Sequence, residues 1–187
     1  MGKVIKESLR MYGERYGKLP CPTPITLVKT NADFGLPAAD CDTTPTTGVT
    51  HNSPIVSKTG GVPYKVLGLS ESFAADEWDN RYVYTVSNAF ISSIDNDDEG
   101  VVNVNDRGAN IITDEAAFVV YSPGKTGLGG TNHDNLSTET CNVGNLDGEN
   151  CGGVAGRFID SSIRETDAAA NFYDCLLYTS PSPRDRG

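Results

Sequence analysis

The sequence predicts an α+β fold in which an amphipathic helix at the amino terminus packs on an antiparallel β-sheet. Four apolar residues recur at positions i, i+4, i+7 and i+11 and therefore share one face of a helix over residues 2–17. These residues are Ile5, Leu9, Tyr12 and Tyr16. Several β-branched and aromatic runs follow, separated by long loops rich in Gly, Asn and Thr. One helix followed by several strands is the element order of an α+β domain.

The predicted elements each have a local reason. The helix ends before Pro20 and Pro22, because proline cannot continue a helix and restricts the residue before it. Three runs predict strands: the aromatic run 81–87, the alternating run 101–105 and the continuously apolar run 116–122. Shorter strands are expected near 55–56 and within 157–163, and a helical turn within 70–77. In sequence order these strands predict an antiparallel meander.

Length and charge restrict the class of protein. The 187 residues fit one domain, and the formal net charge is −10, from 15 Lys and Arg against 25 Asp and Glu. A protein that binds a phosphate backbone needs a basic surface, so the sequence predicts no nucleic-acid partner. No apolar run approaches the roughly 18 residues of a membrane span, and the charged segment 1–9 does not resemble a secretory signal peptide.

The last thirteen residues differ from the rest of the chain. Residues 175–187 contain two Ser-Pro steps and resemble the peptide that results when a sequencing-adaptor sequence is translated in frame. We therefore expect one domain over residues 1–174, with native coding ending near Asp174, and a disordered tail over 175–187.

Four cysteines remain when Cys175 is set aside, and an even number suits a disulfide framework. They are Cys21, Cys41, Cys141 and Cys151. Of the three connectivities we favour Cys21–Cys41 and Cys141–Cys151, each of which closes a short polar loop. The alternative is free or metal-bound thiols, although neither pair has the C-x-x-C spacing of a zinc or redox site. Disulfides predict an oxidising compartment: the periplasm, the cell surface or the exterior.

An acidic run offers a candidate calcium site. Asp95, Asp97, Glu99 and Asp106 follow the order of a calcium-binding loop, although positions five and twelve depart from the usual residues. No helix is predicted on either side, so the alternative is a solvated acidic hairpin turn. A second candidate combines Asp134, Asp147 and Glu149. The sequence therefore requires no cofactor but leaves Ca²⁺ as a candidate ligand.

The sequence predicts no catalytic residues and hence no enzyme. Gly124-Lys125-Thr126 resembles the end of a phosphate loop, but the first glycine of that motif is replaced by Val119, so a tight turn with left-handed glycines is expected instead. The chain has two histidines, His51 and His133, both in polar loops and both expected to be solvated. No G-x-S-x-G motif marks a nucleophile.

Several segments, taken in order, resemble a known family. They are Lys18-Leu-Pro-Cys-Pro22, residues 61–69 (GVPYKVLGL), residues 76–84 (DEWDNRYVY) and residues 116–130 (AAFVVYSPGKTGLGG). This ordered set resembles type IV pilin-like proteins, namely minor pilins and type II secretion pseudopilins made with a prepilin leader. The resemblance covers most of residues 1–174.

The resemblance implies a structural subunit of a pilus-like fibre or secretion pseudopilus. Its partners would be other pilin or pseudopilin subunits, and it would be anchored in the bacterial inner membrane with a periplasmic head, or lie in an extracellular fibre. Ile5, Leu9, Tyr12 and Tyr16 would then bury the second half of a longer helix against the sheet. The leader and the hydrophobic half-helix would precede Met1. Lys125 stands in the 122–127 turn where the family's calcium-binding members favour acidic residues.

Two other functions remain open from the residues alone. The acidic segment 95–106 and the Asn/Asp-rich loops suit a secreted, Ca²⁺-dependent binding or adhesion module. His51 or His133 with a loop carboxylate would suit a small secreted hydrolase.

Overall fold

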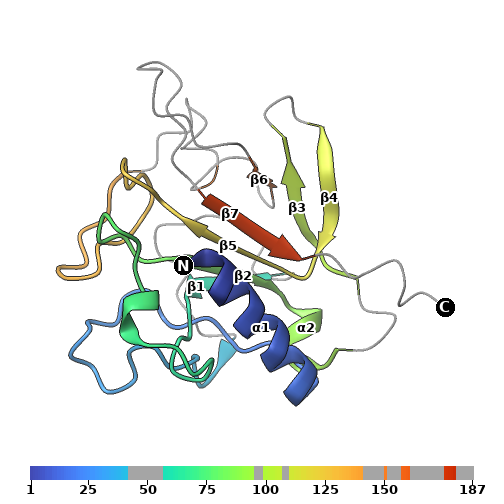
Figure 1. Cartoon of the computed structure of the whole chain (residues 1–187), viewed down its shortest axis with the longest axis horizontal. Helices are drawn as coiled ribbons and strands as arrows, with labels where there is room; N and C mark the ends of the chain where they lie inside the picture. Colours follow the sequence, from blue (N-terminus) through green and yellow to red (C-terminus); the bar gives the residue numbers. More distant parts are fainter. Residues whose placement is uncertain are drawn as a thin grey trace.

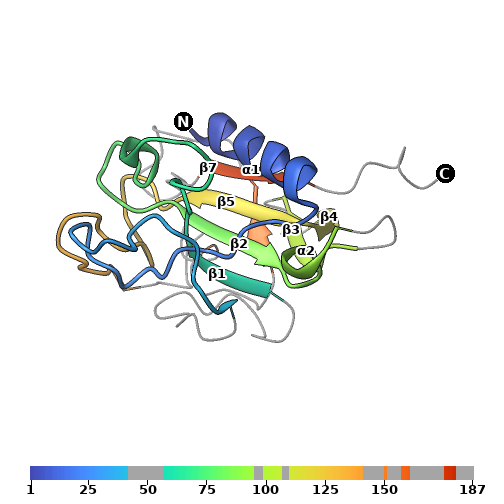
Figure 2. The same ribbon diagram turned by 90° about the horizontal axis from the view of Figure 1, so that it is seen from below.

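One helix lies across a four-stranded antiparallel sheet, and a smaller sheet stands beside it (Figures 1 and 2). The computed structural model describes residues 1–41, 57–94, 99–106, 110–140, 150, 157–160 and 175–179. Its helices are α1 (Gly2–Tyr16), the 3₁₀ turn η2 (Glu71–Phe73) and α2 (Ala89–Ser92). Its strands are β1 (Ser57–Gly61), β2 (Val83–Ser87), β3 (Val102–Asn105), β4 (Ile111–Ala116), β5 (Phe118–Ser122), β6 (Arg157–Ile159) and β7 (Cys175–Thr179). The predicted α+β class is confirmed.

The predicted single meander is wrong, because the strands form two sheets. The larger has the order β1-β2-β5-β7 and is antiparallel throughout. The smaller has the order β4-β3-β6, with β3 antiparallel to β4 but parallel to β6. The change of sheet occurs at Ala117, between β4 and β5, inside a run that the sequence predicts as one strand.

The two central strands are buried on both faces. Tyr84, Val86, Phe118 and Val120 face the cluster that includes Ile5 and Leu9 of α1. Their neighbours Val83, Val119 and Tyr121 face the residues of the smaller sheet, among them Val104 and Phe158. Since successive side chains of a strand point to opposite faces, a strand covered on both sides has no polar face. This explains why 116–122 is continuously apolar.

Strand β7 corrects the expected disordered tail. Residues 175–179 pair antiparallel with β5, with Cys175 opposite Ser122 and Thr179 opposite Phe118. Two leucines, a tyrosine and a threonine give this segment a high strand propensity, and β5 would otherwise leave its backbone groups unpaired on that side. The boundary expected at residue 174 therefore does not separate structure from disorder. The remaining residues of the tail, 180–187, lie outside the described residues.

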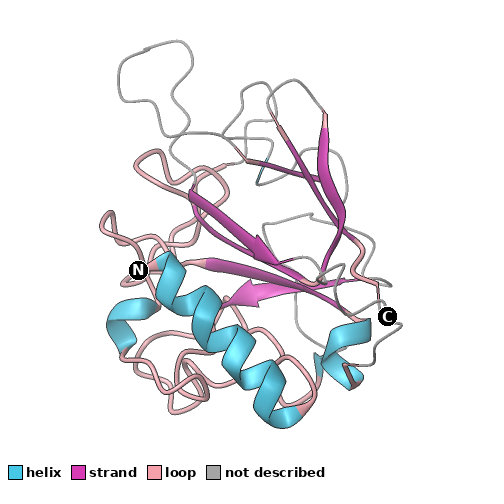
Figure 3. Ribbon diagram, turned by 45° about the vertical axis from the view of Figure 1, so that its right-hand side comes forward, coloured by secondary structure: helices cyan, strands magenta, loops and turns pink. Residues whose placement is uncertain are grey.

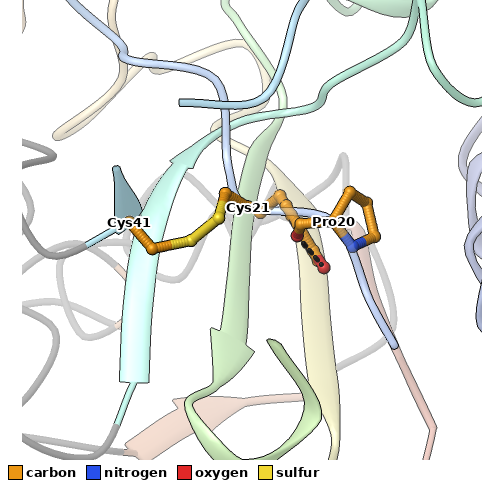
Figure 4. Close-up of a disulfide and its surroundings, with 4 residues drawn as sticks. Pro20, Cys21 and Cys41 are labelled. Carbon is orange, nitrogen blue, oxygen red and sulfur yellow. Dashed lines mark hydrogen bonds between the residues drawn. A yellow bond between two sulfur atoms is a disulfide. The ribbon is translucent and has the colours of Figure 1, made fainter. Parts of the chain in front are cut away.

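The Cys21–Cys41 disulfide is confirmed. Its Cα atoms lie 5.7 Å apart, and it closes a loop between residues 20 positions apart (Figure 4). The loop starts beside the core, because the hydroxyl of the buried Tyr84 donates a 3.1 Å hydrogen bond to the carbonyl of Pro20. Cys141 and Cys151 lie outside the described residues, so their pairing stays a prediction.

Replacing Cys21 and Cys41 together by serine should lower the free energy of unfolding by about 2–4 kcal/mol, because the unfolded chain gains the freedom of an open loop. Urea denaturation followed by circular dichroism measures this loss. The same variant under reducing conditions is the control for any other disulfide. An unchanged urea midpoint without reductant would show that the loop is held without the bridge.

Candidate assembly surface

One face of α1 is fixed in the core. Ile5 and Leu9 are fully buried and join the apolar cluster above β2 and β5. One turn later the buried position is Gly13, where an added Cβ would lie 3.1 Å from the Cδ1 atom of Ile94. The helix ends at Gly17, whose φ of 63° and N–H bond to the Gly13 carbonyl (2.8 Å) form a left-handed cap. The predicted helix over 2–17 is therefore confirmed within one residue.

The predicted apolar stripe is wrong at its last member. Tyr12 is half-buried, and Tyr16 is 52% exposed, with its ring 4.4 Å from that of Tyr12 and under the guanidinium of Arg15. The segment after α2 covers the end of α1 at Gly13, and its Ile94 N–H donates to the carbonyl of Gly17. In the last turns of α1 the buried residue is therefore Gly13, and the tyrosine positions are more exposed. Ile5 and Leu9 hold the helix on the sheet, while Tyr16 lies at the surface.

A second apolar face of α1 is exposed. Met1, Val4 and Met11 all project from the helix into solvent. Val4 and Met11 are seven residues apart and so share one face, roughly 100° around the helix from Ile5. Beside them Arg10 is held by both Glu7 and Glu14, which lie one turn before and after it. The helix thus presents apolar side chains both to its own sheet and to the outside. Figure 2 shows α1 lying along one face of the larger sheet.

A buried arginine ties together the loops at one end of the sheet. Arg81 is 2% exposed, and its guanidinium donates to the carbonyls of Ile25 (2.8 Å) and His133 (3.3 Å). The same group lies 4.7 Å from the centre of the Phe34 ring. Burial lowers the pKa of Arg81, but an arginine remains charged at neutral pH. Sequence reasoning missed this residue because it was assigned only to the start of a strand.

His133 is not the solvated loop residue that the sequence predicts. Its side chain is mostly buried, its ring lies 5.4 Å from that of Phe34, and its Nε2 atom lies 3.4 Å from a carboxylate oxygen of Glu71. The reason is the hydrogen bond from its backbone N–H to the carbonyl of Asp79, which draws the loop inward. His51 lies outside the described residues.

Asp76 organises the turn that leads into β2. Its carboxylate accepts hydrogen bonds from the hydroxyl of Ser122 (2.5 Å) and from the backbone N–H groups of Trp78 (3.0 Å) and Asn80 (2.9 Å). The Ser122 hydroxyl in turn accepts the N–H of Gly124 (3.0 Å). Burial raises the pKa of Asp76, although these hydrogen bonds act in the opposite direction. One carboxylate thus joins the 76–80 turn to the end of β5.

The turn after β5 confirms the structural interpretation of the Gly-Lys-Thr segment. Gly124 and Gly127 have φ values of 65° and 64°, a conformation that side chains rarely adopt. The N–H of Gly127 bonds the carbonyl of Gly124 (3.2 Å), and the amide of Asn80 also donates to that carbonyl (2.8 Å). The segment is a tight turn held by Asn80.

The candidate calcium residues are only partly described. Asp95 and Asp97 lie outside the described residues, as do Asp147 and Glu149. Glu99 is exposed, and the Asp106 carboxylate caps its own turn by accepting from the backbone and amide of Asn110. Asp134 forms an ion pair with Lys29. Within the described ranges no three His, Cys, Asp or Glu residues are grouped to hold a metal, and Ca²⁺ binding stays a prediction.

No protein-family model, curated protein or solved structure matches this chain. Among the described helices, none combines the length and the apolar character needed to cross a bilayer.

Truncating either buried residue of α1 should destabilise the fold strongly. Leu9→Ala and Ile5→Ala each remove a fully buried side chain, and we expect a loss of about 2–5 kcal/mol in the free energy of unfolding. Met11→Ala on the exposed face is the matched control and should change it by less than about 0.5 kcal/mol. Chemical denaturation measures all three, and equal losses would contradict the assignment of the two faces.

Removing the Asp76 carboxylate should loosen the turn. Asp76→Ala leaves three hydrogen-bond donors without their acceptor, and we expect the free energy of unfolding to fall by about 2–3 kcal/mol. Glu77→Ala changes an exposed neighbour and is the control, with an expected fall of less than about 0.5 kcal/mol. Denaturation at pH 7 compares the two variants. A loss no greater than that of the control would show that solvent replaces the carboxylate.

The pKa of Asp76 also sets a direction with pH. Because the pKa of Asp76 in the folded chain is raised above the ordinary value of 3.8, the folded chain binds this proton more tightly than the unfolded chain does. The stability of the native chain relative to the Asp76→Asn variant should therefore be highest below that ordinary value and decline as the pH rises through the raised pKa. Denaturation at several pH values across this window measures the change. A relative stability that rises with pH would show that the hydrogen bonds to Asp76 affect its pKa more than burial does.

Proposed function

We propose that this chain is a structural subunit of a type IV pilus-like fibre or a type II secretion pseudopilus, and that it works by assembly rather than catalysis. The observation that carries the proposal is that α1 has apolar residues on two faces, one buried and one exposed. Ile5 and Leu9 seat the helix on the sheet, and Val4 and Met11 remain exposed on another face. A helix that serves only its own domain needs a single apolar stripe, so the second stripe favours packing against other subunits.

Two further features support this function. The ordered motifs that resemble those of pilin-like proteins coincide with ordered turns and strands here. The 76–84 segment contains the Asp76 turn and enters β2, and the 116–130 segment contains β5 and its glycine turn. The Cys21–Cys41 disulfide is typical of an oxidising compartment. A subunit anchored in the inner membrane with a periplasmic head, or lying in an extracellular fibre, meets that condition.

The first test concerns the precursor. The gene should be expressed with its genomic upstream region in a bacterium that carries a prepilin peptidase. We expect a membrane-associated precursor that shortens when the peptidase is present and does not shorten when the peptidase gene is deleted. An upstream region that encodes no leader and apolar helix would overturn the proposal.

The second test concerns the exposed stripe. Val4→Glu combined with Met11→Glu should abolish incorporation into sheared fibres, while denaturation shows that the head still folds. Val28→Glu is a matched control, because Val28 and Val4 are each 46% exposed and Val28 lies in a loop away from the helix. Normal incorporation of the double variant would contradict a role for this stripe in assembly.

A further inference from the structure

One asparagine of the chain stands in the sequence pattern that accepts N-linked sugars. Asn135, Leu136 and Ser137 form Asn-x-Ser without a proline in the middle. No other asparagine in the sequence is followed two positions later by serine or threonine. The pattern marks an asparagine whose side-chain amide receives a sugar where it lies on a surface loop. The structure decides whether Asn135 meets that condition.

The turn that contains Asn135 is closed at its base. The backbone N–H of Asn132 donates to the carbonyl of Ser137 (2.8 Å). The side-chain oxygen of Asn132 accepts the N–H groups of Asp134 (3.0 Å) and Asn135 (3.1 Å). These bonds hold the backbone of the turn in one conformation, while the side chains of Asn135 and Ser137 are both exposed. The condition of surface exposure is therefore met.

Contacts with other loops fix the turn on the body of the molecule. The backbone N–H of His133 donates to the carbonyl of Asp79 (2.8 Å), and Asp134 forms an ion pair with Lys29. Figure 3 shows most of the described loops, drawn in pink, on the side of the molecule away from the β3–β4 hairpin. On that side the orange segment before residue 140 projects outward in Figure 1. A group attached to Asn135 would therefore extend into solvent without displacing either sheet.

The amide of Asn135 is held by its oxygen. The Oδ1 atom accepts the backbone N–H of Ser137 (2.8 Å), so this side of the planar amide faces the turn. The Nδ2 group is the other arm of the same amide. A hydrogen bond to an amide oxygen draws electron density toward the oxygen, which makes the Nδ2 protons easier to remove. The turn thus prepares the atom that an N-linked sugar is joined to.

We propose that Asn135 is a glycan attachment site. The donor is a sugar whose anomeric carbon carries a phosphate leaving group, on either a lipid pyrophosphate or a nucleotide. The Nδ2 atom forms a bond to that carbon, the bond from the carbon to the phosphate oxygen breaks, and the phosphate leaves with the electron pair. One Nδ2 proton passes to a base of the transferase. The Cys21–Cys41 disulfide supports the proposal, because it is typical of an exported chain and N-linked sugars occur on the surface loops of such chains.

Mass spectrometry of the whole chain, purified from the cells that make it, tests the site. We expect the peptide that contains Asn135 to carry the mass of a sugar, and an amidase that cleaves N-linked glycans to remove it and leave aspartate. Asn135→Gln and Ser137→Ala should each abolish the added mass. Ser137→Thr keeps the hydroxyl that completes the pattern and should retain it. Denaturation of each variant shows that the fold is kept.

Asn31 is a matched control within the same chain. It is also exposed, and its Oδ1 atom likewise accepts the N–H two residues on, from Asp33 (2.8 Å). It has the same local geometry but an aspartate where the pattern requires serine or threonine. Asn31 should therefore carry no sugar, and Asn31→Gln should leave the sugar on Asn135 unchanged.

A second measurement identifies the donor. Blocking synthesis of lipid-linked sugars in the same cells should remove the modification if the sugar comes from a lipid carrier, and its persistence would identify a nucleotide sugar. An unmodified Asn135 in the native chain would overturn the proposal, as would a sugar that remains on Asn135 in the Ser137→Ala variant. Neither result depends on leader processing, so the site and the proposed function can fail separately.

Discussion

The burial of β2 and β5 on both faces is the constraint on which the fold depends. Their side chains are apolar in both directions, so each face needs a cover. Helix α1 supplies one through Ile5 and Leu9, and the smaller sheet supplies the other through Val104 and Phe158. A sheet with a single cover would expose Val119 and Tyr121 to water. The second sheet is therefore part of the core and not an appendage of it.

Polar side chains hold the loops in place, as apolar side chains hold the sheet. The segments around residues 22–40, 62–82 and 123–140 contain little regular structure, yet they bury Phe34 and Tyr64. Arg81 and Asp76 reach across them and bond backbone groups that would otherwise lack partners. A few well-placed hydrogen bonds can fix a loop in this way, because an unpaired buried backbone group is costly.

The sequence predicted those features that a local pattern determines. Helix α1 followed from its periodicity, β5 from its apolar run, and the first disulfide from a short cysteine spacing. Tyr16 has the right helical phase but lies at the end of the helix, where Gly13 is covered instead, so phase alone could not place it. The acidic strand β4 and the parallel pairing of β6 depend on contacts that the local sequence pattern does not show.

The candidate residues divide along the same line. Asp76 could have been found, because an aspartate that precedes a turn commonly accepts the N–H two residues on, as it does from Trp78. Arg81 and His133 gave no such signal. These two residues are 52 positions apart along the chain, and they become buried only when their loops pack against each other. The exposed stripe of α1 was present in the sequence as Val4 and Met11, but only the position of the sheet shows which apolar face is free.

The position of β7 has a consequence for how the protein is made. Strand β5 ends at Ser122, whereas its neighbour on one side begins at Cys175. During synthesis the ribosome therefore releases β5 well before the segment that completes the sheet. Until then one row of backbone donors and acceptors along an apolar strand has no neighbour, which is the condition under which nascent chains associate wrongly. Strand β5 therefore gains its second neighbour from the last strand of the described chain.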